Sequence, residues 1–132
     1  MQFTTYNLQL RLIASFFLLT SCGGGGGNGG PTGPPGPGGS VTIITVTSSG
    51  ANPRQVTVDL GTRIRWVNND NRAHEMSSDP HPEHDSCPEL NSRLLGPGQL
   101  HETNNLVTAR TCGFHDHLLP EVVTLTGTIT IR

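Results

Sequence analysis

Alternation of hydrophobic and polar residues with a period of two is the dominant pattern within residues 41–132. The clearest runs are 41–47, which is rich in β-branched residues, and 55–60, 63–66 and 126–132. Alternation of this kind is typical of half-buried strands, with one face in the core and the other in water. Turn-forming residues separate the runs at 49–53, 60–61, 68–71 and 96–98. The spacing of these short strands predicts an all-β sandwich or barrel.

The first 40 residues have a different composition. Arg11 is the only charged residue among the first 21, and an apolar stretch at 12–19 leads into Leu19-Thr20-Ser21-Cys22. This order resembles a bacterial lipoprotein signal, in which residues 1–21 are removed and Cys22 is lipidated. The alternative is an ordinary secretory signal with an incidental cysteine. Several acyl chains on Cys22 would anchor the protein to a membrane without a spanning helix.

Residues 22–40 follow as a run of glycine and proline. This segment has no apolar side chains to bury, so it cannot repay the entropy of ordering, and the sequence predicts a disordered linker. The folded domain is therefore expected at 41–132. Together these segments predict an exported protein at the bacterial cell envelope, lipid-anchored and facing the periplasm or the cell surface.

Charge and composition narrow the function. The chain has 8 basic residues, all of them arginine, against 10 acidic residues, which gives a net charge of −2. Nothing in this balance indicates a nucleic-acid-binding surface. The sequence contains no P-loop and no nucleophile elbow, and no set of carboxylates or of Ser, His and Asp has a diagnostic spacing, so it predicts no catalytic residue. Six histidines in so short a chain, several beside acidic residues, point instead to metal binding.

The cysteines support an exported domain. If Cys22 is lipidated, Cys87 and Cys112 remain as an even pair, and a disulfide between them is the expected state outside the cytosol. That bond would join the histidine-rich segment 74–89 to the strand leading into 114–117.

The order of motifs along the domain carries a further signal. Val56, Val58, Gly61, Ile64, Trp66, Asn68, Asp70 and His74 come in a characteristic spacing, followed by Leu95-Gly96-Pro97-Gly98 and by the strand pattern at 125–131. This order resembles that of the cupredoxins, the blue copper protein family. The resemblance implies a Greek-key β-sandwich, and it places His74 at the position of the family's first copper-binding histidine.

The copper ligands of that family do not carry over unchanged. Blue copper centres use two histidines, one cysteine and a weak axial ligand. One alignment takes Cys112 as the thiolate and His115 as the second histidine, which leaves Cys87 unpaired. The other aligns Phe114 with the family's aromatic residue and puts Asp116 at the cysteine position. We prefer the second alignment because it accounts for Phe114 and the cysteine pair together.

Under this alignment the domain could still bind a metal through nitrogen and oxygen ligands, which suit Cu(II) and other divalent ions, with Cu(II) bound most strongly. The predicted metal ligands are His74, His115, Asp116 and His117, with His81 and His84 as secondary candidates. Strand alternation sends His115 and His117 to one face and Asp116 to the other. Asp116 with His74 therefore forms one candidate site, and His115 with His117 forms another. His101 lies apart from both clusters.

The predicted function is the binding of copper, or of another divalent metal, for metal handling at the cell envelope, with no enzyme activity indicated. Two alternatives remain. One is a blue electron-transfer protein that uses Cys112, and the other is a metal-free sandwich that serves in adhesion or protein binding.

Overall fold

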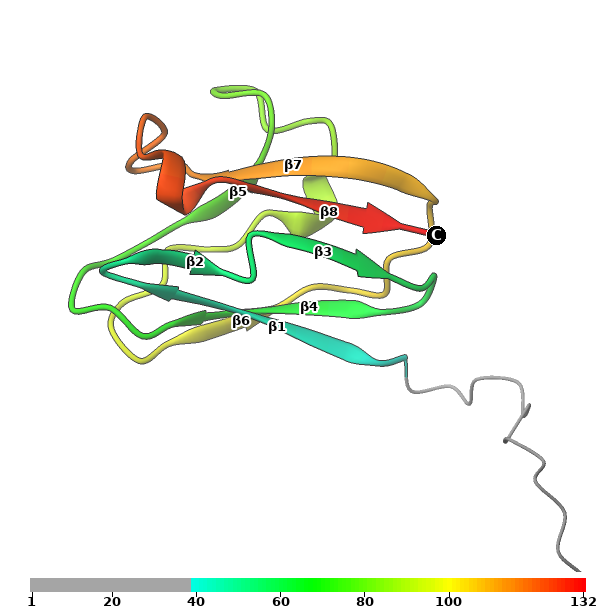
Figure 1. Ribbon diagram of the computed structural model, residues 1–132, viewed down its shortest axis with the longest axis horizontal. Helices are drawn as coiled ribbons and strands as arrows, with labels where there is room; N and C mark the ends of the chain where they lie inside the picture. The colour runs from blue at the N-terminus through cyan, green and yellow to red at the C-terminus, as the bar shows by residue number, and fades with distance from the viewer. Residues whose placement is uncertain (1–38) are drawn as a thin grey trace, which may run out of the picture. The chain divides into compact units, whose positions relative to one another are not determined.

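The computed structural model describes residues 39–132, which form two four-stranded sheets packed face to face (Figure 1). The strands are β1 (Val41–Thr47), β2 (Gly50–Asn52), β3 (Gln55–Val58), β4 (Arg63–Asn68), β5 (Met76–Ser78), β6 (Leu100–Glu102), β7 (Arg110–Asp116) and β8 (Gly127–Ile131). Two single 3₁₀ turns, η1 (Pro88–Leu90) and η2 (Val123–Leu125), interrupt the loops. The predicted all-β fold is confirmed.

The predicted signal peptide, Cys22 and nearly all of the predicted linker lie outside the described residues. Within 39–132, no helix is long and apolar enough to cross a membrane.

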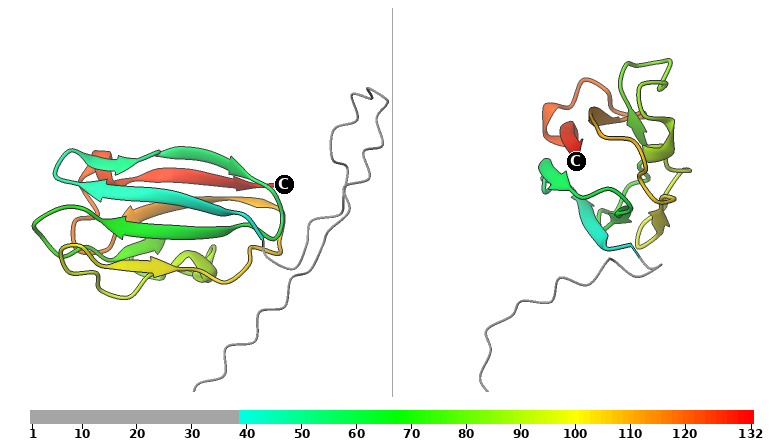
Figure 2. Two further views of the ribbon diagram at one scale, coloured as in Figure 1. Left: turned by 90° about the horizontal axis from the view of Figure 1, so that it is seen from below. Right: turned by 90° about the vertical axis from the view of Figure 1, so that its right-hand side faces the viewer.

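The chain moves repeatedly between the two sheets. One sheet has the order β2-β1-β4-β6 and the other β3-β8-β7-β5. Strands β1 and β4 pair in parallel, as do β3 and β8, while the remaining pairs are antiparallel. Strands far apart in the sequence thus become neighbours, as the Greek-key prediction requires. Figure 2 shows the layers from below and along the strands.

The core lies between the sheets and follows the alternation of the sequence. In β4, Ile64 and Trp66 point inward and are fully buried, whereas Arg63 and Arg65 point outward and pair with Glu102 on β6. Trp66 meets Phe114 of the opposite sheet edge to face, with ring centroids 5.1 Å apart. This geometry is favoured for aromatic pairs, and it locks the two sheets together at the level of the histidine-bearing end of β7.

A disulfide joins Cys87 to Cys112, as the sequence predicts, with the two Cα atoms 6.0 Å apart. It ties the loop before η1 to β7, and both cysteines are buried. A cysteine in a disulfide offers no thiolate to a metal. The alignment that makes Cys112 a copper ligand therefore does not describe this structure.

Candidate metal centre

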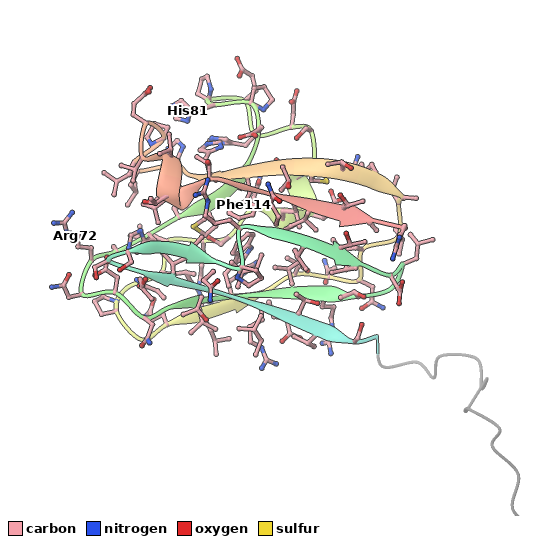
Figure 3. All side chains as sticks on the ribbon, viewed as in Figure 1. Arg72, His81 and Phe114 are labelled. Carbon is pink, nitrogen blue, oxygen red and sulfur yellow. A yellow bond between two sulfur atoms is a disulfide. The ribbon has the colours of Figure 1, made fainter. Side chains whose placement is uncertain are left out.

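Three polar residues at the end of β7 and just beyond it face opposite sides of the sheet, with His115 and Asp116 in the strand and His117 directly after it. Asp116 points inward and is fully buried, while His115 and His117 point outward, as strand alternation predicts. Backbone pairing continues past the end of the strand, because the N–H of His117 donates to the carbonyl of Glu75 (2.7 Å). In Figure 3, Phe114 lies between the sheets and His81 lies in the loop above β7, on the other side of that strand.

Inside the sandwich, His74 and Asp116 lie together. His74 Nδ1 is 2.7 Å from Asp116 Oδ2, and His74 Nε2 is 3.2 Å from Asp70 Oδ2. The second oxygen of Asp116 accepts hydrogen bonds from the backbone N–H groups of Glu75 and Leu118, both at 3.1 Å. Both ring nitrogens of His74 are thus engaged by carboxylates. A metal ion at this place would have to displace one of those carboxylates from the ring.

Asp116, His74 and Asp70 form a hydrogen-bonded row, and Asp70 is its more accessible end. A cavity of about 130 Å³ reaches Asp70 and His74 and is also lined by Arg72 and Leu119. Burial raises the pKa of the Asp70 carboxyl, but the hydrogen bonds from the Asn71 amide and His74, with the charges of His74 and Arg72, outweigh it and hold that pKa below its ordinary value. Asp70 therefore stays ionised next to the ring of His74.

Outside the sandwich, four histidines form one cluster. His81 and His84 come from the loop between β5 and η1, and they lie over His115 and His117 of β7 and its extension. The ring centroid of His84 is 5.0 Å from that of His115 and 4.7 Å from that of His117, and His81 is within 5.4 Å of all three. One ring nitrogen from each of His81, His84 and His117 lies within 4.8 Å of the others. We call these four residues the outer histidine cluster.

His115 differs from the other three because it is buried, with 4% of its surface exposed. Its Nδ1 is 2.7 Å from Oδ1 of Asp79, whose side chain is half-exposed. Its Nε2 is buried and has no hydrogen-bond partner among the described residues. Metal-binding histidines usually donate the second ring N–H to a carboxylate, so a histidine held in this way fits a metal site.

The loop that carries His81 and His84 is fixed to the second sheet by its backbone. His84 has a φ of 55°, in the left-handed region, and its carbonyl accepts hydrogen bonds from Ser78 Oγ and Asn91 Nδ2, both at 3.0 Å. The N–H of Asp79 donates to the carbonyl of Gly113 on β7 (3.1 Å). Asp79 can approach this closely only because residue 113 is glycine, since a Cβ there would lie 1.9 Å from Asp79 Oδ2.

Electrostatics favour a neutral imidazole at His84 of the outer histidine cluster. Burial lowers the pKa of His84, and the positive charges that His115, His117 and His81 would carry lower it further, while Glu75 opposes the shift. A neutral imidazole is the form that binds a metal. The sixth histidine, His101, is on β6 in the first sheet, where it pairs with Trp66 of β4. It lies apart from the cluster, as expected.

The structure thus brings the predicted ligands together in two groups, as strand alternation predicts. His74 and Asp116 form the inner pair, whereas His115 and His117 join His81 and His84 outside, and the metal-binding role of all six stays a prediction. Sequence reasoning missed Asp79 and Gly113. Asp79 is one of several acidic residues in its segment, and only the pairing of the loop with β7 distinguishes it.

No family model matches the chain, and no curated protein matches it. Solved structures do match. A purple cupredoxin from Nitrosopumilus maritimus superposes with a TM-score of 0.57 and 17% identity, over 68% of this chain and 98% of that one. A methionine-to-alanine mutant of amicyanin, in its Cu(I) form, gives 0.55 and 13%, over 68% and 80%. A mutant plastocyanin of a fern gives 0.55 and 17%, over 69% and 100%.

At these identities the likeness establishes the fold. The described domain is a cupredoxin-fold β-sandwich, as the resemblance in the sequence implied. Its disulfide and its inner Asp70–His74–Asp116 chain distinguish it from a domain with a cysteine-ligated copper centre.

Proposed function

We propose that the protein binds copper or another divalent transition-metal ion at the outer histidine cluster, on the outside of the second sheet. The observation that carries this proposal is the convergence of ring nitrogens from His81, His84 and His117 within 4.8 Å of one another. Imidazole nitrogens suit copper, zinc and nickel ions, and three ligands on one short loop and one strand end form a compact site.

Metal handling at the cell envelope is the role that fits this site. His81 is exposed, so an ion can reach the cluster from solvent. The surrounding loop carries the exposed acids Glu83 and Asp85, whose charge attracts cations. The lipoprotein-like segment ending at Cys22 would hold the domain at a membrane surface. Membrane fractionation of cells that express the Cys22→Ser variant tests this location, because the variant should move from the membrane to the soluble fraction.

The metal-binding proposal is tested on the full chain. Purified protein is dialysed against Cu(II) or Zn(II), and the bound metal is quantified per chain. We expect one equivalent to be retained, His81→Ala and His117→Ala to weaken retention strongly, and the control His101→Ala to leave it unchanged. If the wild-type chain retains no metal, the metal-free adhesion or protein-binding interpretation becomes the leading one. If His101→Ala weakens retention as much as the cluster variants do, the site is elsewhere.

A further inference from the structure

We infer that His115 is the fourth ligand of the outer histidine cluster, that Asp79 is its positioning residue, and that the completed site takes an ion which accepts four imidazole nitrogens in a tetrahedron, such as Zn(II). This inference rests on the proposed function and specifies its coordination.

The first argument is the unsatisfied nitrogen of His115. Buried polar atoms almost always have a hydrogen-bond partner, because losing water without a replacement is costly. Nε2 of His115 has none among the described residues, although the surrounding loop and strand leave only 4% of this residue exposed. The ring centroids of His81 and His84 lie 5.4 and 5.0 Å from the ring centroid of His115. A cation held by these neighbours would supply the missing partner.

The second argument is the tautomer that Asp79 selects. An ionised carboxylate only accepts hydrogen bonds, so the 2.7 Å contact between Asp79 Oδ1 and His115 Nδ1 places a proton on Nδ1. In the neutral ring, Nε2 then carries the lone pair. Asp79 is itself held by its backbone N–H on Gly113 and by the absence of a side chain there. The ligand nitrogen is thus prepared before any ion arrives.

The third argument is the spacing of the other ligand atoms. Nε2 of His84 is 3.2 Å from Nδ1 of His117 and 3.3 Å from Nδ1 of His81. Two nitrogens at Zn–N bond length on adjacent corners of a tetrahedron are separated by about 3.3–3.4 Å, against about 2.9 Å in a square plane. These two separations are close to the tetrahedral value and are also hydrogen-bond distances between the rings themselves. The ring of His115 lies outside the grouping within 4.8 Å, so it must shift towards the other three rings to complete the site. Four protein ligands also leave no open coordination position, which is the arrangement of a site that holds an ion rather than one that activates a substrate.

Cobalt(II) provides the test, because four-coordinate tetrahedral Co(II) absorbs visible light strongly and six-coordinate Co(II) absorbs weakly. The full chain is titrated with Co(II), and the absorption and the bound metal are measured on the same samples. Excess Zn(II) is then added to displace the cobalt. We expect an intense spectrum at one equivalent that Zn(II) abolishes.

Three variants separate the roles. His115→Ala should retain Co(II) with a weaker, shifted spectrum, because water takes the fourth position. Asp79→Asn keeps all four imidazoles and should weaken metal affinity by roughly 10–100-fold, the usual effect of losing such a carboxylate. His101→Ala is the control and should match the wild type. If His115→Ala does not fold by near-ultraviolet circular dichroism, Asp79→Asn and the wild-type spectrum still decide.

Each other outcome overturns the inference. A weak, six-coordinate spectrum of bound Co(II), or an intense spectrum that His115→Ala leaves unchanged, excludes His115 as a ligand while the proposed function stands. If the protein retains Cu(II) but neither Co(II) nor Zn(II), tetrahedral coordination is excluded, while the proposed function stands. Failure to bind any of the three ions overturns the proposed function and the inference with it.

Discussion

The Nδ1 atom of His74 and the Oδ2 atom of Asp116 lie 2.7 Å apart, fully buried between the sheets. These are the two positions where the resemblance to cupredoxins would put a copper-binding histidine and the copper-binding cysteine. A direct hydrogen bond between the side chains now occupies that place, and Asp70 closes its far side. These hydrogen bonds give the inner pair a structural role, and its role as a metal-ligand pair stays a prediction.

Substitution of His74 by alanine should destabilise the domain without weakening metal binding at the proposed outer site. The change leaves Asp116 buried with its Oδ2 unpaired, and leaving a buried acceptor without its hydrogen bond typically costs about 1–3 kcal/mol. Urea unfolding of the metal-free proteins measures the difference. Metal content is determined under conditions where the variant is folded by circular dichroism. Loss of the metal from folded His74→Ala would identify the inner pair as a ligand set after all.

Substitution of Gly113 by alanine should weaken metal binding although Gly113 offers no ligand. The new Cβ would overlap the carboxylate of Asp79, so that carboxylate must move away from His115. Stability should fall modestly, because losing the hydrogen bond to the buried Nδ1 of His115 costs about 1–3 kcal/mol and the better intrinsic fit of alanine in a strand returns only about 0.5–1 kcal/mol. Calorimetric titration with Zn(II) and urea unfolding give the two quantities. Gly96→Ala, which meets nothing closer than 3.7 Å, is the matched control. Equal affinities for the two variants would contradict the role of Asp79.

Removal of the disulfide should lower both stability and metal affinity. Cys87 and Cys112 are 25 residues apart, and a cross-link of that span contributes about 3 kcal/mol by restricting the unfolded chain. The same bond anchors the loop of His81 and His84 on β7, so its loss should also loosen the site. Denaturant unfolding and Zn(II) titration of the Cys87→Ala, Cys112→Ala double variant test both effects. A large loss of stability with unchanged affinity would show that backbone hydrogen bonds alone hold the loop.

The metal-free protein should lose stability as the pH falls, through His84. Its pKa is lowered in the folded state, so the unfolded chain, with an ordinary value of 6.5, binds the proton more tightly. The stabilisation from His84 is therefore fully present above about pH 6.5 and is lost as the pH falls through the depressed folded value. His84→Asn should remove this part of the pH dependence, and asparagine tolerates the left-handed backbone there. Unfolding of both proteins in chelator, over a pH series, measures the difference, and parallel curves would refute it.

The period-two pattern sufficed to predict the sandwich because long, half-buried strands such as β1 and β8 leave a regular sequence trace. The three-residue strands β2, β5 and β6 leave too little sequence to show a period, and only tertiary pairing defines them. Alternation also placed Asp116 and His115 on opposite faces of β7 correctly. The period-two pattern determines which side chains of a strand face the core, and so fixes the register of the strand.

The partners of those side chains could not be predicted in the same way. The hydrogen bond between His74 and Asp116 depends on the distance between two strands, and the contact of Asp79 with His115 depends on how an irregular loop folds back on β7. His81 and His84 were secondary candidates in the sequence, yet the loop places them at the centre of the outer cluster. Loop conformation is set by such tertiary contacts and leaves no periodic signal.

The outer histidine cluster sits on the outside of the second sheet, and its four histidines are not part of the hydrophobic core that contains Trp66 and Phe114. Binding or loss of an ion at this site would therefore leave the packing of the hydrophobic core unchanged. An ion bound at the proposed site would thus be able to leave without disturbing the core of the domain.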